Sequence, residues 1–477
     1  MGIFSKVPHY LSPKTQIEEH VEELLSPIEK FTHNQIATGI FLAIASVLGM
    51  IIVNSPLSES FHHIAEYSFG LFLENHQFAL PIHEWISSGL MAVFFLYIGL
   101  ELKREMLVGE MRHFKQSITV LFAAAGGMIL PGLVYIAFNH GGAYAHGWAI
   151  PMATDAAFAL GALALLTRHA SPMSFAFLAA LAIFDDLGSV MIIAVFYSHG
   201  FDLVMTGYSA IIFSALLLCN VSGVRHTGIY TLLGIILWYC VFESGVHATV
   251  AGILIAIAVP ARPKVLQEGF IRRAKALLFM MDHVGNQEGD ILKAPKQHHL
   301  LQEIREMASK ATTPLQAWEH RLKPRVTVYV LPLFALFNAG VVLSVQNLDG
   351  ILFSPVVLGI FFGLLVGKPI GVTACTWFAV RFCGGKLPEG LTLPDIFGLA
   401  LLAGMGFTMA LLIANISFEA GSQMLEQAKL SILAASLCAG IAGTVWLIKC
   451  SNVKKTRFKN DIINDEIAPR RHGEETD

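Results

Sequence analysis

Long apolar stretches separated by short polar connections follow one another from about residue 36 to residue 449. A helix needs about 20 mainly apolar residues to cross a hydrocarbon core of about 30 Å, and tilted or interrupted helices depart from this length. The pattern therefore predicts an all-α polytopic membrane protein with about twelve transmembrane helices. We expect their cores at residues 36–54, 85–102, 116–138, 148–166, 173–198, 201–219, 227–242, 246–260, 324–345, 354–382, 395–416 and 427–449.

The connections between these stretches differ in their basic residues. Lys and Arg are absent from residues 55–84, 139–147, 199–201, 243–245 and 346–353. The alternate connections hold Lys103, Arg104, Arg112, Lys115, Arg168, Arg225, Arg262, Arg381 and Lys386. Because Lys and Arg accumulate in short cytoplasmic loops, this alternation predicts that both termini are cytoplasmic. Lys429 departs from the pattern, but a single lysine near a helix end can extend its ammonium group to the membrane surface.

Three segments lie outside the predicted transporter domain at 36–449. Residues 1–35 are expected to be a cytoplasmic N-terminal segment, in which residues 12–34 have the spacing of an amphipathic surface helix. Residues 264–323 are rich in charge and predict a cytoplasmic insertion between two spans. Residues 450–477 begin basic and end acidic with few apolar side chains, so we expect a disordered cytoplasmic tail.

Composition agrees with a chain that is embedded in a membrane. Hydrophobic residues make up 55% of the 477 residues and charged residues only 14%, and the mean hydropathy is +0.61. The net charge of −3 gives no indication of a nucleic-acid partner. The six cysteines are scattered without a CxxC pair, which favours packing roles.

The ionisable residues that stand out within the predicted spans are Asp155, Asp185, Asp186, His247 and Lys368. A charged side chain near the bilayer centre costs roughly 2.5 to 3.5 kcal/mol, so intramembrane acids usually line a cavity or have a partner. Neighbours on a helix point about 100° apart, so Asp185 and Asp186 are expected to have different partners. One acid is expected to take an ion, and the other the ammonium group of Lys368. A structural helix cap or salt bridge is the alternative for these residues.

Asp155 follows Pro151 and Thr154 in a helix of small residues, which predicts an interruption there. A carboxylate can neutralise the positive N-terminal ends of a broken helix, and a lysine can neutralise the negative C-terminal ends. The string GMGFT at residues 404–408 predicts a second interruption, and one break in each half suggests inverted repeats. Small-residue packing without a break is the alternative for either segment.

Seven strings of the chain resemble one known family. They are GLELKRE (99–105), ATDAAFALG (153–161), FDDLGSV (184–190), SGVHATVAG (244–252), LPLFALFNAGV (331–341), GLLVGKPIG (363–371) and GMGFTM (404–409). In this order and on these spans they resemble the NhaA sodium/proton antiporters over residues 36–449. The resemblance implies about twelve transmembrane helices with inverted repeats, of which the fourth and eleventh are broken and cross at mid-membrane.

The resemblance also implies roles for the intramembrane residues. Asp186 is similar to the principal sodium and proton carboxylate of the family. Asp185 is similar to its partner in proton exchange and to the salt-bridge mate of Lys368. Thr154 and Asp155 resemble the residues at the helix crossing.

A group of residues that senses pH is the second implication of the resemblance. The residues that match it are Glu101, Arg104, Glu105 and Glu319, together with His247. On chemistry alone, an exposed charge cluster explains the first three equally well, and a packing role explains the histidine.

Two departures from the family pattern affect these expectations. Ser87 and Ser88 stand where the family commonly has Asn-Asp, so the pH profile is expected to differ. The connection at 264–323 is longer than the resemblance implies, and Glu319 lies within it.

Competition for one site gives the expected mechanism. Two acids close together do not easily ionise together, so Na⁺ or Li⁺ can replace protons as the neutralising charge. With this competition, the resemblance implies an electrogenic, pH-regulated antiporter of the bacterial inner membrane that exchanges cytoplasmic Na⁺ or Li⁺ for external H⁺ by alternating access. The resemblance further implies a homodimer, with no enzymatic activity and no cofactor.

Two other classes fit the sequence less well. An intramembrane aspartyl protease places its two aspartates on separate helices and has a GxGD signature, which this chain lacks. A passive cation channel could use acid rings, but a membrane lysine and broken helices favour a coupled carrier.

Overall fold

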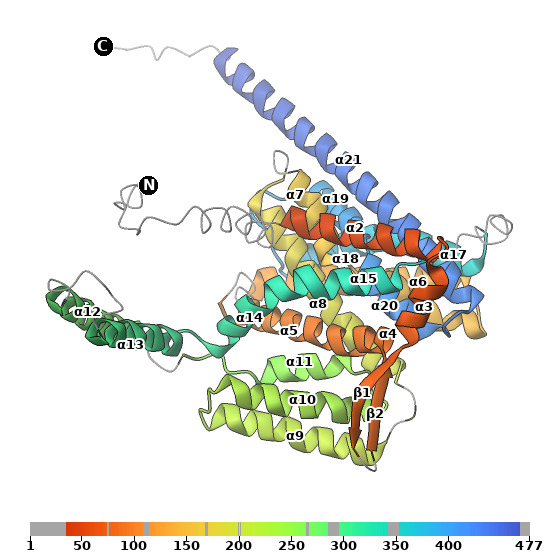
Figure 1. Cartoon of the computed structure of the whole chain (residues 1–477). Coiled ribbons are helices and arrows are strands. Elements are labelled where there is room, and N and C mark those ends of the chain that lie inside the picture. The colour runs from red at the N-terminus through yellow and green to blue at the C-terminus, as the bar shows by residue number, and fades with distance from the viewer. Residues whose placement is uncertain are drawn as a thin grey trace, which may run out of the picture.

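The computed structural model describes residues 35–73, 76–108, 114–166, 170–198, 200, 202–263, 267–284, 295–341 and 353–467. Within these residues the chain is almost entirely helical, and the long helices lie side by side in one bundle (Figure 1). Among them, 6 helices are long and apolar enough to cross a membrane, or up to 9 spans if each bent helix pair is one span. The chain is therefore an all-α membrane protein of several spans, and the full set of twelve stays a prediction.

The uninterrupted long helices lie where the hydropathy pattern predicts spans. They are α4 (Ile82–Glu84) with η1 (Trp85–Leu90) and α5 (Met91–Val108), then α6 (Phe114–Phe138), α8 (Pro172–Phe196), α9 (Leu203–Val221), α17 (Pro355–Phe362) with η7 (Gly363–Gly367) and α18 (Lys368–Phe382), and α21 (Gln423–Ile467). Shorter helices at expected spans are α10 (Thr227–Glu243), α11 (Thr249–Ala258), and η5 (Val326–Val330) with α15 (Leu331–Asn338).

Two helix pairs bend where the sequence predicts interruptions. The 3-10 helix η3 (Ala143–Met152) and α7 (Ala156–Leu165) meet at 41°, and α19 (Leu393–Ala403) and α20 (Phe407–Ser417) meet at 51°. Ala153 and Asp155 have extended backbone, which ends the hydrogen bonding of η3 before α7 begins. A third bend, of 110°, separates α2 (Gln35–Val53) from α3 (Ser58–Glu66).

Close packing of α6 against α18 fixes the position of Lys368, the first residue of α18. A Cβ atom on Gly126 would lie 2.2 Å from the carbonyl oxygen of Gly371, and one on Gly371 would lie 2.1 Å from that of Gly126. No side chain fits between these two backbones. Small residues therefore allow the two helices to approach closely, as is common between membrane helices.

One short β-hairpin accompanies the helices of this all-α protein. In the connection at 55–84, β1 (Ser68–Leu73) pairs antiparallel with β2 (His76–Pro81). Phe78 of β2 makes edge-on ring contacts with Trp85, Trp238 and Phe242, so the hairpin packs on η1 and α10 (Figure 1). The hydropathy pattern missed the hairpin because short strands carry a much weaker signal than membrane helices.

The described residues of the insertion expected at 264–323 are mostly helical. It contains α12 (Gln267–Val284), α13 (Pro295–Ala311) and α14 (Pro314–Arg325), and α12 and α13 extend away from the bundle (Figure 1). Arg273 of α12 forms an ion pair of 2.7 Å with Glu303 of α13. The insertion thus contains two helices that pack against each other.

The structure also differs from the expected tail. Helix α21 continues beyond the membrane stretch to Ile467 instead of ending near residue 449. The sequence has no Gly or Pro between Gly443 and Pro469, so nothing in it terminates the helix. Residues 468–477, and the amphipathic helix expected at 12–34, lie outside the described residues.

Candidate functional site

Asp185 and Lys368 form a fully buried ion pair. The ammonium nitrogen of Lys368 lies 3.0 Å from Oδ2 of Asp185, and both side chains have no exposed surface. The hydroxyl of Thr154 donates to the same oxygen at 2.6 Å. The pair that the resemblance implies is therefore present, and it joins α8, α18 and the break between η3 and α7.

The lysine also reaches the end of the 3-10 helix. Its Nζ atom donates to the carbonyl oxygen of Met152, the last residue of η3, at 2.5 Å. A helix C-terminus leaves carbonyl groups without partners and carries a partial negative charge. Lys368 thus lies at a negative helix end, as the sequence predicts for this residue.

Asp155 caps two helices at once. As the N-cap of α7 it accepts from the backbone N–H of Phe158 at 3.1 Å. Its other carboxylate oxygen accepts from the backbone N–H of Thr408 at 2.9 Å and from the hydroxyl of Thr408 at 2.6 Å. Its own N–H donates to the carbonyl oxygen of Met405 at 2.7 Å. The carboxylate therefore neutralises the positive ends of α7 and α20 and joins the two breaks.

Thr408 is a functional candidate that the sequence reasoning did not name as a partner of Asp155. Its hydroxyl is buried against that carboxylate, and it lies in the first turn of α20. The glycine-rich break at 404–406 predicts a helix that begins close to Thr408, so the position of this residue near a helix N-terminus could be predicted. Its bond to Asp155 could not be predicted, because the two residues are 253 positions apart in the sequence.

Asp186 is buried without a comparable set of partners. Its exposed fraction is 1%, and in the described part of the chain its Oδ1 atom has no hydrogen-bond partner. The Oδ1 atom of Asp185 is likewise without one. Adjacent acids on α8 thus have different surroundings, as helix geometry predicts, and Asp186 keeps an oxygen available for an ion or a proton.

Three charged residues that match the family's pH-sensing group lie together. Arg104 pairs with Glu319 at 2.9 Å and with Glu105 at 2.9 Å, so the end of α5 is joined to α14. Glu101, one turn earlier on α5, lies close to Tyr97 and interacts electrostatically with Glu319. Tyr97 is a neighbour that the sequence did not suggest.

His247 lies apart from this group. Its ring nitrogen Nδ1 is 2.9 Å from the hydroxyl of Thr249, at the start of α11. The other end of α11 is close to α5 near the charged group, because Lys103 donates to the carbonyl oxygen of Val259 at 2.6 Å. A helix of this length spans about 15 Å. The structure therefore does not bring His247 into contact with Arg104 or Glu319.

Ser88, which stands where the family commonly has an acid, lies in the π-helical turn η1. Its carbonyl oxygen accepts from the indole N–H of Trp238 at 3.4 Å. This turn contacts α10 through stacked rings of Trp85 and Trp238. The region of Ser87 and Ser88 therefore belongs to the aromatic contact between η1 and α10.

Comparison with known sequences decides the family. The profile of the Na⁺/H⁺ antiporter 1 family matches residues 29–447. The chain belongs to the Na⁺/H⁺ antiporter 1 family. A protein of Sulfurimonas denitrificans named Na(+)/H(+) antiporter NhaA is 41% identical over 426 residues, covering 89% of this chain and 96% of its own length. A Saccharophagus degradans protein named Na(+)/H(+) antiporter NhaA 1 is 39% identical over 453 residues, covering 94% and 97%.

Membership of the Na⁺/H⁺ antiporter 1 family agrees with the resemblance seen in the motifs. The relatives are named as transporters, which agrees with the expectation that the chain is not an enzyme. The match covers the bundle from α2 into α21, including both breaks. The ion pair, the double cap of Asp155 and the buried acids of α8 are thus features of a family member.

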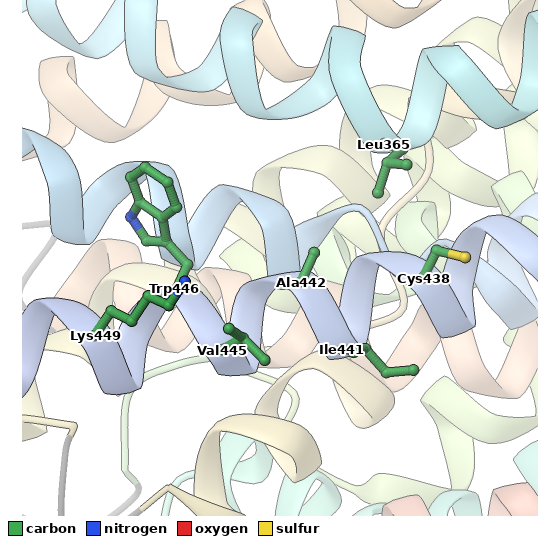
Figure 2. Close-up of a pocket in the computed structure, with 7 residues that line it drawn as sticks. All are labelled: Leu365, Cys438, Ile441, Ala442, Val445, Trp446 and Lys449. Carbon is green, nitrogen blue, oxygen red and sulfur yellow. The ribbon is translucent and has the colours of Figure 1, made fainter.

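A surface groove of about 540 Å³ lies away from the acids. Leu365, Ile441 and Val445 line it between η7 and α21, with Trp446 and Lys449 toward one end (Figure 2). Its lining is mostly apolar, as expected where membrane helices face lipid. None of the residues that line it is an acid.

Proposed function

We propose that the chain is an electrogenic, pH-regulated antiporter that exchanges cytoplasmic Na⁺ or Li⁺ for external H⁺. Asp185 and Asp186 are the proposed ion- and proton-binding residues, and the protein works by alternating access in a bacterial inner membrane with both termini cytoplasmic. The observation that carries the proposal is the buried site of Asp186, Asp185 and Lys368 beside two broken helices in a member of this family.

Competition between the ion and the proton supplies the coupling. Asp186 is buried, and no basic side chain of the described residues forms an ion pair with it, so a proton or a metal cation is needed to neutralise it. Because both neutralise the same carboxylate, binding of one displaces the other. If the protein changes its access only when the site is neutral, the two fluxes become an obligatory exchange.

Lys368 supplies a second proton-linked charge. When the cation binds the acids, its positive charge weakens the attraction between the ammonium group of Lys368 and Asp185. The ammonium group then releases a proton. More than one proton then moves per Na⁺. The membrane potential contributes about 2.3 kcal/mol per charge per 100 mV to such an exchange, so Na⁺ can be expelled against its gradient.

The two broken helices provide the moving elements. Asp155 holds the positive ends of α7 and α20 together, and Lys368 holds the end of η3. These contacts place charged side chains at half-helix ends, as in other transporters whose halves move around a central site. We therefore propose the NhaA-like arrangement of inverted repeats with the two breaks crossing at mid-membrane.

The charged group at the end of α5 is the proposed regulator. Arg104 joins α5 to α14 through Glu319, so a change in protonation there would change the contact between the two helices. Glu101 and Glu105 belong to the same proposal, and the assignment of His247 stays a separate prediction. We further propose a homodimer formed through the outward connection that contains β1 and β2.

Ion-dependent proton movement in everted membrane vesicles tests the function. Na⁺ should dequench a pH-sensitive dye in vesicles with the unaltered protein, and Asp186→Asn should abolish this response while the protein remains in the membrane. An absence of Na⁺- or Li⁺-dependent proton movement at every pH would refute the antiporter proposal. A flux of Na⁺ that does not require protons would instead indicate a passive channel.

A further inference from the structure

One turn of α8 carries three buried oxygen atoms that lack hydrogen-bond partners within the described residues. They are Oδ1 of Asp185, Oδ1 of Asp186 and Oγ of Ser189. All three residues are at most 1% exposed. Ser189 follows Asp186 by three positions and Asp185 by four, so its Cβ atom is about 5–6 Å from theirs on the helix surface. The serine hydroxyl is therefore a neighbour of both acids.

The hydroxyl of Ser189 lacks a local hydrogen bond that several other helical serines make. A serine inside a helix commonly donates to the carbonyl oxygen four residues earlier, which satisfies its hydroxyl locally. This bond is present, at 2.6 to 2.9 Å, for Ser46, Ser209, Ser214 and Ser417. Ser189 makes no such bond, although it has the same helical carbonyl within reach. Its oxygen is left without a partner at a position where that is unfavourable.

An unsatisfied polar group in a buried position needs an explanation, and a bound ion is one when other unsatisfied oxygens lie on the same helical turn. Two carboxylate oxygens without partners lie on the same turn, and Oδ2 of Asp185 is already engaged by Lys368 and Thr154. Hard cations are bound by several oxygen ligands, in which neutral oxygens commonly complement carboxylates. A hydroxyl oxygen beside two available carboxylate oxygens fits this requirement.

We propose that Ser189 supplies a neutral oxygen ligand to the transported Na⁺, together with Asp186 and the available oxygen of Asp185. This inference rests on the proposed function, because it concerns the same site. It adds a third ligand residue to the two acids, and all three lie on α8. The site then holds the dehydrated ion with oxygens of one helical turn, and the serine raises affinity without adding a charge that a proton must neutralise.

The test is the Na⁺ affinity of Ser189→Ala and Ser189→Cys. The alanine removes the oxygen, and the cysteine fills nearly the same volume with a soft sulfur that is a poor ligand for a hard cation. Both variants should raise the apparent KM for Na⁺ in vesicle exchange, and weaken equilibrium binding of radioactive Na⁺ to the purified protein, by on the order of tenfold. Their thermal stability should be unchanged or higher, because an unsatisfied buried hydroxyl is removed.

Ser436→Ala is the matched control. The Ser436 hydroxyl is also buried without a hydrogen-bond partner in the described residues, but it lies on α21, which packs mainly against α17, α19 and α20. Its KM for Na⁺ should stay at the wild-type value. Asp186→Asn serves as the second reference, because it should abolish exchange.

The outcomes separate this inference from the proposed function. If Asp186→Asn abolishes exchange but both Ser189 variants keep the wild-type KM and Na⁺ binding, the serine is not a ligand and only a buried water needs to satisfy it. If Ser436→Ala raises KM as much as the Ser189 variants do, the effect is one of packing and the inference fails. If the unaltered protein shows no exchange, the proposed function itself fails.

Discussion

Removing one partner of the ion pair between Asp185 and Lys368 should destabilise the protein more than removing both. Both side chains are completely buried, and their charged atoms are 3.0 Å apart. Removing one member of a buried pair leaves an uncompensated charge and costs about 3–5 kcal/mol, whereas replacing both members is often neutral. We expect Lys368→Met to lower the free energy of unfolding by an amount near the lower end of this range. The hydroxyl of Thr154 still donates to Asp185, and the carboxyl group can take up a proton.

The double variant Asp185→Asn/Lys368→Met makes the prediction specific. It removes both charges and keeps an amide oxygen that can accept from Thr154, so its free energy of unfolding should lie within about 1 kcal/mol of wild type. The assay is unfolding of the purified protein in mild detergent by a denaturing detergent, followed by tryptophan fluorescence. The two single variants and the double variant give a coupling energy for the pair.

The exposed pair between Arg273 and Glu303 is the control. Its side chains are 55% and 31% exposed, so solvent screens their interaction. Arg273→Gln should change the free energy of unfolding by less than about 1 kcal/mol. The reasoning would be refuted if Lys368→Met unfolded like wild type, or if the double variant were no more stable than Lys368→Met.

Three further predictions follow from particular contacts. Thr408→Val removes a hydroxyl that donates to Asp155 at 2.6 Å, so the free energy of unfolding should fall by about 1.5–3 kcal/mol in the same assay, and an unchanged value would contradict the role of this cap. Gly371→Ala places a Cβ atom 2.1 Å from a backbone oxygen of α6 and should reduce the folded yield in size-exclusion chromatography, whereas Gly207→Ala, with open space around it, should not. Arg104→Gln breaks the ion pair with Glu319, so it should alter the pH profile of exchange while lowering the free energy of unfolding by less than about 1 kcal/mol. His247→Gln should leave the pH profile unchanged. The opposite pattern would favour the histidine as the pH sensor.

Hydropathy and motif patterns by themselves determined the class of the protein. Apolar stretches of membrane length are local properties, so the positions of α2, α6, α8, α9 and α18 could be predicted from the sequence. Charges inside those stretches are costly enough that Asp155, Asp185, Asp186 and Lys368 could be named as candidates without a structure. Local breakers such as Pro151 and Gly406 likewise marked where the helices bend.

Long-range contacts were decided only by the tertiary structure. Helix geometry alone left open which of Asp185 and Asp186 lies beside Lys368, because this depends on the rotation of α8 relative to α18; the family resemblance implied Asp185, and the structure places it there. The bond from Thr408 to Asp155 and the approach of Gly126 to Gly371 join residues that are far apart in sequence. The lack of a hydrogen bond at the Ser189 hydroxyl could not be predicted either, because a serine in a helix usually donates to a backbone carbonyl of the same helix. The sequence determines which helices form and which polar groups are costly to bury, and packing determines which of those groups find partners.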